Sequence, residues 1–184
     1  MIEDNITKMA REIGTMVLNM IMAHDQCANE PHKRVRKVDG LPYGVHPPLS
    51  FFLMLHETSF PVWKRFLYGR ALNWHDLKED TSADPRIIGD KEVEVLVDKL
   101  TFSDDMDSSA EAIRRGPEIA MLKSYDTFGN LFGLDAIEWT IEKKKRRIEK
   151  AEKLFAYARP HYPELYIWPM ADALLATIKA RIGI

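Results

Sequence analysis

The sequence is poor in cysteine, and it has neither a long hydrophobic run nor an excess of one charge. Its only cysteine, Cys27, excludes an intramolecular disulfide and a cysteine-based zinc cluster, and it favours a reducing, cytoplasmic compartment. No run of about 18 apolar residues could span a membrane, and the apolar stretch 13–22 lacks the basic start and the cleavage site of a secretory signal. The 26 basic and 28 acidic residues give a net charge of −2, which does not indicate binding to nucleic acid.

Strand-like alternation and internal repeats are also missing, whereas apolar residues recur at helical spacing. The length of 184 residues suits one domain, and 46% apolar with 29% charged residues is typical of a globular protein. The sequence therefore predicts an all-α bundle of about six to eight helices in a single domain, 1–184. The main predicted helices cover about 3–23, 61–76, 87–100, 118–131, 136–158 and 165–182, the last bent at Pro169.

Segment 74–81 carries the densest group of acid and base side chains. His75 and Asp76 are adjacent, so they offer a divalent metal one nitrogen and one carboxylate oxygen. Glu79 and Asp80 follow four positions later, and on a helix they return to the same face as the His-Asp pair. This group of four side chains predicts a site that binds or catalyses.

Two residues elsewhere in the chain extend this candidate site. His46 precedes a double proline at a predicted loop–helix junction, where the rigid backbone fixes its direction. Asp126 lies on a predicted helix and shares a face with Asn130 one turn later. Two histidines and two carboxylates suit manganese, iron, cobalt or zinc, and the set of donors alone does not choose among these ions.

The order of these motifs resembles the HD-domain metal-dependent phosphohydrolases, and the flanking residues are most similar to the RelA/SpoT hydrolases. Residues 36–47 match a basic pair followed by Gly-x-Pro-Tyr and His-Pro, and residues 75–81 match His-Asp-x-x-Glu-Asp-Thr. Residues 123–131 match Lys-x-x-Asp-x-x-x-Asn-Leu. The similarity covers about 20–182 and leaves no room for a synthetase half, so the chain looks like a stand-alone small alarmone hydrolase of the HD-domain bundle type.

The resemblance implies an enzyme that removes the 3′-pyrophosphate of guanosine tetra- or pentaphosphate, usually with manganese. Glu79 and Asp80 would position or deprotonate the attacking water, and which of the two is the base stays open. Arg36 and Lys37 would contact the nucleotide, and Asn130 would help to hold the nucleotide or the water. The divalent ion, with zinc, cobalt or iron as alternatives to manganese, would have four ligands: His46, His75, Asp76 and Asp126.

The sequence departs from the family pattern beside the site. Gly129 stands where relatives often carry a ring side chain, Thr127 where they carry a basic residue, and segment 102–107 is acidic where they often have lysines. A deoxynucleoside tri- or monophosphate, as in phage dATP triphosphohydrolases, is therefore the alternative substrate. A non-catalytic nucleotide sensor is the third hypothesis, although such a sensor has no need of Glu79 and Asp80. The sequence does not decide whether the chain forms a homo-oligomer.

Other histidines and charges have simpler interpretations. The pair His24-Asp25 has no acids one turn later and is interpreted as a surface pair at a helix end. His56-Glu57 lacks a second histidine at the spacing of a metal site and is interpreted as structural. The basic run 143–147 is interpreted as the solvated face of a helix.

Overall fold

The computed structural model describes residues 2–29, 43–103 and 106–184, with side chains described from residue 7 onward. This part of the chain forms an all-α bundle, as the sequence predicts, and its only β pairing is an isolated bridge between Ala28 and Thr81. Among the described residues, every helix is too short or too polar to span a membrane.

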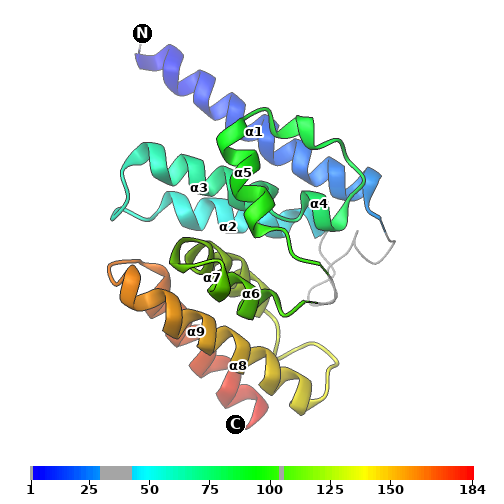
Figure 1. The fold of residues 1–184 in the computed structure, drawn as a ribbon, viewed down its shortest axis with the longest axis vertical. Helices are drawn as coiled ribbons and strands as arrows, with labels where there is room; N and C mark the ends of the chain where they lie inside the picture. Colours follow the sequence, from blue (N-terminus) through cyan, green and yellow to red (C-terminus); the bar gives the residue numbers. More distant parts are fainter. Residues whose placement is uncertain (1, 30–42, 104–105) are drawn as a thin grey trace.

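The first part of the chain forms the upper group of helices in Figure 1. Its elements are α1 (Ile2–Cys27), η2 (Tyr43–Val45), α2 (His46–Leu55), α3 (Val62–Trp74), α4 (Leu77–Asp80), η3 (Pro85–Ile88) and α5 (Lys91–Leu100). α2 and α3 pack closely against each other, and α3 also contacts α5. The N-terminal end of α1 extends away from the rest of the bundle in Figure 1.

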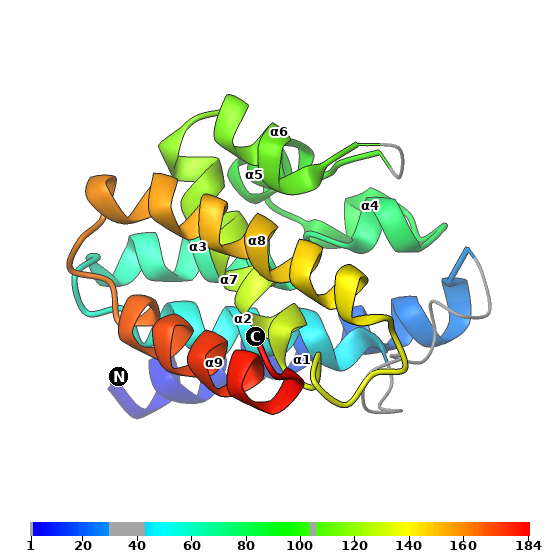
Figure 2. The same ribbon diagram turned by 90° about the horizontal axis from the view of Figure 1, so that it is seen from below.

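The second part of the chain forms the lower group in Figure 1, and Figure 2 shows the same helices from below. Its elements are α6 (Ser108–Arg114), α7 (Pro117–Leu131), α8 (Ile141–Ala158), η4 (Arg159–His161) and α9 (Ile167–Ile182). α7 is buried along almost its whole length and contacts α2, α3 and α5 on one side and α6, α8 and α9 on the other. The two groups of helices therefore meet at α7.

Local capping residues explain why two predicted helices begin later in the structure than expected. The helix expected over 87–100 is divided into η3 and α5, because Gly89 adopts a left-handed conformation (φ 68°) and Asp90 caps α5 through the amides of Glu92 and Val93. The helix expected over 136–158 begins only at Ile141, after a cap in which the Thr140 hydroxyl accepts from a backbone amide.

Proline has a different effect from the one expected in α9. Pro169 lies in the first turn of this helix, which begins at Ile167, and not in its interior. The amide groups of the first turn have no partner within the helix, so the missing N–H of Pro169 removes no helical hydrogen bond. The bend expected at this residue thus has no hydrogen-bonding cause.

A buried carboxylate connects the two groups of helices on the side of α9. The side chain of Glu57, just after α2, is 1% exposed. It accepts hydrogen bonds from the Tyr125 hydroxyl at 2.5 Å and from the amides of Tyr166 and Ile167 at 2.8 and 3.1 Å. A carboxylate at a helix N-terminus satisfies amides that the helix leaves unpaired. The structural interpretation of Glu57 agrees with these contacts.

Candidate metal centre

The His-Asp pair lies at a break between two helices and not inside one helix. α3 ends at Trp74, His75 is its C-cap, and Asp76 is the N-cap of α4. The Nδ1–H of His75 donates to the carbonyl of Leu72 at 2.6 Å, so Nε2 is the ring nitrogen directed at the other side chains of the site. A backbone acceptor at Nδ1 is the usual arrangement for a histidine that binds a metal through Nε2.

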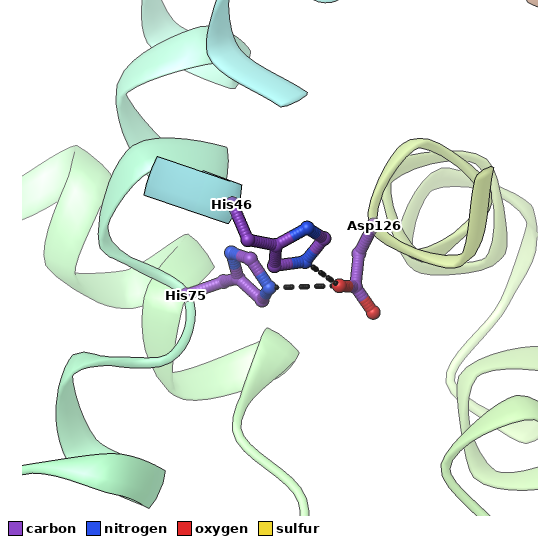
Figure 3. A group of neighbouring side chains, drawn as sticks. All are labelled: His46, His75 and Asp126. Carbon is purple, nitrogen blue, oxygen red and sulfur yellow. Dashed lines mark hydrogen bonds and ion pairs between the residues drawn. The ribbon is translucent and has the colours of Figure 1, made fainter. Parts of the chain in front are cut away.

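Three of the expected ligands meet at one buried point (Figure 3). His46 is the first residue of α2, and its Nε2 lies 2.7 Å from Oδ1 of Asp126 on α7. The Nε2 of His75 lies 3.0 Å from the same oxygen. The ligand atoms of these three residues are all within 4.8 Å of one another, and each residue is at most 3% exposed. The structure thus brings together residues separated by up to 80 positions in the sequence.

The fourth expected ligand, Asp76, joins this group from the α3–α4 break. Its Oδ1 lies 3.0 Å from Nε2 of His75. Its Oδ2 is buried and has no hydrogen-bond partner within the described part of the chain. A buried carboxylate oxygen without a donor is costly in a closed fold and is a suitable ligand for a cation. The two imidazole nitrogens and the carboxylate of Asp126 match the donors of a divalent transition metal, so this buried group could hold such an ion.

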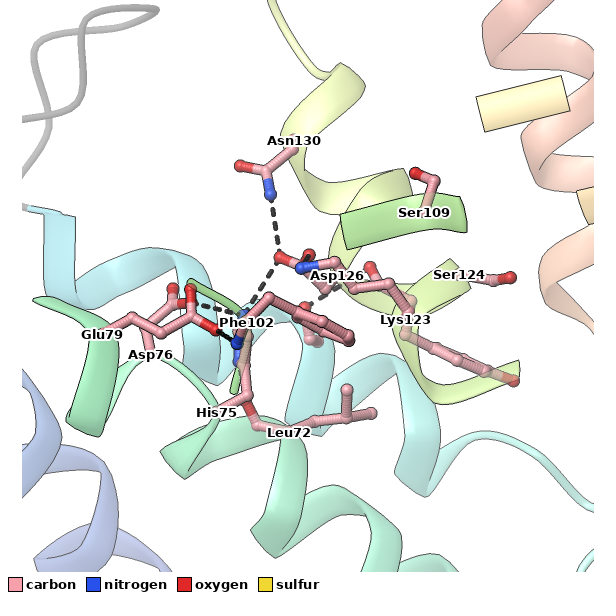
Figure 4. Close-up of polar contacts among 12 residues, drawn as sticks. Leu72, His75, Asp76, Glu79, Phe102, Ser109, Lys123, Ser124, Asp126 and Asn130 are labelled. Carbon is pink, nitrogen blue, oxygen red and sulfur yellow. Dashed lines mark hydrogen bonds and ion pairs between the residues drawn. The ribbon is translucent and has the colours of Figure 1, made fainter. Parts of the chain in front are cut away.

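Cationic neighbours keep Asp126 ionised. Burial favours its neutral form, but Lys123 and His75 outweigh burial and hold the pKa of Asp126 well below its usual range. Nζ of Lys123, a residue only 8% exposed, is 2.7 Å from Oδ2 of Asp126, and Nδ2 of Asn130 donates to Oδ1 at 2.8 Å (Figure 4). Burial lowers the pKa of His75, yet the charges of Asp76 and Asp126 raise it well above the ordinary value.

The pKa of Glu79, a carboxylate beside the expected ligands, is raised toward neutral pH. Its Oε1 accepts a hydrogen bond from the amide of Phe102 at 2.5 Å (Figure 4). Burial and then the negative charge of Asp76 raise the pKa of Glu79 to about 7, although Lys123 and the amide of Phe102 oppose the shift. A carboxylate with such a pKa can accept a proton and release it again at neutral pH.

Tyr43 belongs to the site although sequence reasoning gave it no role. Its hydroxyl is hydrogen-bonded to Asp80, a buried residue, and the charge of Asp76, burial and Asp80 together raise the pKa of Tyr43. The Tyr43 ring lies edge-on to His46, with ring centroids 6.4 Å apart. Tyr43 belongs to the short helix η2. Its position three residues before His46 was the signal available in the sequence.

His24 contradicts the expectation of a surface pair. Its side chain is 1% exposed, and its ring packs against Tyr43 with centroids 5.2 Å apart, whereas Asp25 is exposed. The end of α1 therefore contributes to the wall behind the site. Arg36 and Lys37, the expected nucleotide contacts, lie outside the described residues.

Lys123 was also missed as a residue of the site, since the sequence motif used it only as a flank. Its spacing of three residues before Asp126 places it on the same helical face, which could have indicated the ion pair. The Lys123 ammonium also lies 4.9 Å from the centroid of the Phe102 ring. The pKa of Lys123 is raised, because Asp126 and Glu79 outweigh the opposite effect of burial.

No protein-family model matches the chain, and no curated protein sequence matches it significantly. Among solved structures, the chain is similar to a metazoan ortholog of SpoT that is described as hydrolyzing ppGpp and playing a role in starvation responses. The two structures superpose with a TM-score of 0.65 at 18% sequence identity, over 93% of this chain and 95% of the other. The fold expected from the RelA/SpoT resemblance is confirmed by this likeness, which extends over nearly all of both chains.

Proposed function

We propose that the protein is a metal-dependent nucleotide phosphohydrolase that removes the 3′-pyrophosphate of guanosine tetraphosphate (ppGpp). The observation that carries this proposal is the buried convergence of His46, His75 and Asp126, with Asp76 beside them. It occurs in a chain that shares its fold with a protein described as hydrolyzing ppGpp. These four residues are proposed to hold the ion, with manganese as the expected metal. We also propose that the protein acts in the cytoplasm.

The carboxylates beside the ligands supply the proton chemistry in this proposal. A bound divalent metal would lower the pKa of water to about 7 and polarise a phosphoryl oxygen. Glu79, with a pKa of about 7, takes the proton of the attacking water. Asp80, held by the Tyr43 hydroxyl, orients that water. The water oxygen bonds to the phosphorus that is attached to the 3′ oxygen. The bond from this phosphorus to the 3′ oxygen then breaks, and the leaving 3′ oxygen takes up a proton. GDP and pyrophosphate are the products.

Contacts with the nucleotide are proposed for three residues. Arg36 suits a bidentate contact with phosphate or stacking on a base, and Lys37 suits a single charge contact with phosphate. Asn130 is half-buried at the edge of the site, where its amide group donates to Asp126. Asn130 therefore orients this ligand and lies beside the nucleotide.

A nucleotide panel tests the proposal. The protein is first freed of metal and then supplied with Mn²⁺, Co²⁺ or Zn²⁺. It is incubated separately with ppGpp and with the deoxynucleoside mono- and triphosphates, and the released phosphates are identified by ion chromatography. Pyrophosphate and GDP from ppGpp in manganese are expected from the wild type and from the control Asp25→Asn, whose side chain is exposed. Asp126→Asn should release neither, because it removes the central carboxylate.

The same panel distinguishes the alternatives. Release of triphosphate or orthophosphate from a deoxynucleotide, with ppGpp left intact, would replace the proposed substrate by the second candidate. The departures at Gly129 and after Thr101 permit that candidate. Tight nucleotide binding without any product in all three metals would show a sensor and contradict the enzymatic proposal.

A further inference from the structure

Gly129 lies against the ring of His46 in the last turn of α7. An ideal Cβ built on Gly129 would be 2.8 Å from Cε1 and 3.0 Å from Nδ1 of His46, and 3.6 Å from Oγ of Ser50. Carbon atoms in van der Waals contact are about 3.5–4.0 Å apart, so any side chain here would displace the imidazole. Glycine is less favourable than alanine in a helix, and this close approach is a physical reason for a glycine at position 129.

The two histidines of the site are held in different ways. His75 has a hydrogen bond from Nδ1 to the carbonyl of Leu72 that fixes its ring. Nδ1 of His46 is buried and, as far as the described residues extend, accepts or donates no hydrogen bond. The orientation of His46 therefore depends on packing: the ring lies on the α7 backbone at Gly129, and its Nε2 points to Asp126.

We propose that Gly129 is a positioning residue for His46, which acts by leaving the space that this imidazole needs to aim Nε2 at the candidate metal centre. The inference rests on the proposed function, because it concerns the same ligand. A ring at position 129 and the observed place of His46 would exclude each other. The position of His46 thus depends on the absence of a side chain at Gly129.

The chain contains two matched control glycines. Gly69 on α3 is also closely packed, because its Cβ would be 2.8 Å from the ring of Phe51, which is apolar and is not an expected ligand. Gly14 on α1 has no atom within 4 Å of a built Cβ. Gly129→Ala, Gly69→Ala and Gly14→Ala therefore introduce the same methyl group against a ligand, against the core and against open space.

The test measures the affinity of the full-length protein for Mn²⁺ and Zn²⁺ by competition with a chromophoric chelator, and its metal-free melting temperature. Gly129→Ala and Gly69→Ala should both lower the melting temperature, and Gly14→Ala should not. Only Gly129→Ala should weaken metal binding, by about 10–100-fold, as is usual when the support of a histidine ligand is disturbed. Unchanged affinity in Gly129→Ala, or an equal loss in Gly69→Ala, would overturn the inference. Failure of the wild type to bind either ion would instead refute the proposed function.

A second measurement does not depend on the folding of any variant. In the metal-free wild type, the position of the ring predicts a nuclear Overhauser effect between the Hε1 proton of His46 and the Hα protons of Gly129. It also predicts that the imidazole shifts the resonances of those Hα protons. Absence of both effects in a folded sample would show that the ring does not lie on Gly129, and the inference would fail.

Discussion

Replacing Glu79 by glutamine should stabilise the metal-free protein at alkaline pH while it abolishes hydrolysis. The folded state raises the pKa of Glu79 from 4.5 to about 7 through burial and the charge of Asp76. The ionised carboxylate is therefore less stable in the folded protein than in the unfolded chain. Glutamine keeps an oxygen that can accept from the amide of Phe102 but carries no charge.

The size and sign of the effect follow from proton linkage. Below pH 4.5 Glu79 keeps its proton in both states, and between pH 4.5 and about 7 only the folded protein keeps it, so stability falls as the pH rises. At about 1.4 kcal/mol per pKa unit, the shift from 4.5 to about 7 gives a full cost of at most about 3.5 kcal/mol. Screening at the partly exposed side chain reduces it to about 1–3 kcal/mol above pH 7.

Urea unfolding of metal-free protein at pH 5 and pH 8 measures this difference. Glu79→Gln should exceed the wild type by about 1–3 kcal/mol at pH 8 and by much less at pH 5. Glu149→Gln, at an exposed position on α8, is the control and should not show this pH dependence. A gain of the same size at both pH values, or no gain at pH 8, would refute the assignment of a raised pKa to Glu79.

Three further substitutions separate metal binding, catalysis and folding. Asp76→Ala should abolish turnover and the metal-induced rise in melting temperature while circular dichroism shows a folded chain; turnover retained under strict metal control would contradict its role. Tyr43→Phe should leave metal affinity unchanged but lower kcat about tenfold or more, because Asp80 loses a hydrogen bond to its charge; an unchanged kcat would show that Tyr43 does not position Asp80. Glu57→Gln should cost about 1–3 kcal/mol in urea unfolding, since an amide group replaces one acceptor of the buried hydrogen bonds, and it should leave metal affinity unchanged.

The sequence was sufficient to predict the all-α fold and to select residues that meet at one point. Helical spacing of apolar residues reports which face of each helix is buried, and this signal is local. The motif order singled out His46, His75 and Asp126, which the structure brings within 4.8 Å of one another. A resemblance in motif order was needed for this selection, because no single spacing connects residues 80 positions apart.

Contacts between distant segments were the part that sequence reasoning could not supply. His24 was interpreted as a surface residue, because it lies at the end of a predicted helix and has no acids one turn later, yet the end of α1 packs its ring against Tyr43. The fit of the His46 ring on Gly129 likewise depends on how α2 crosses α7, and composition does not encode this. By contrast, the ends of α5 and α8 have local causes, the caps Asp90 and Thr140, and closer attention to capping would have predicted them.

Crystals of the wild-type protein grown with Mn²⁺, with diffraction recorded at the manganese absorption edge, test the central claim most directly. One anomalous peak is predicted among the side chains of His46, His75, Asp76 and Asp126, with Nε2 of both histidines bonded to the ion. A peak at any other place, or these four side chains bonded only to one another in manganese at saturating concentration, would contradict the metal centre and the hydrolase proposed on it.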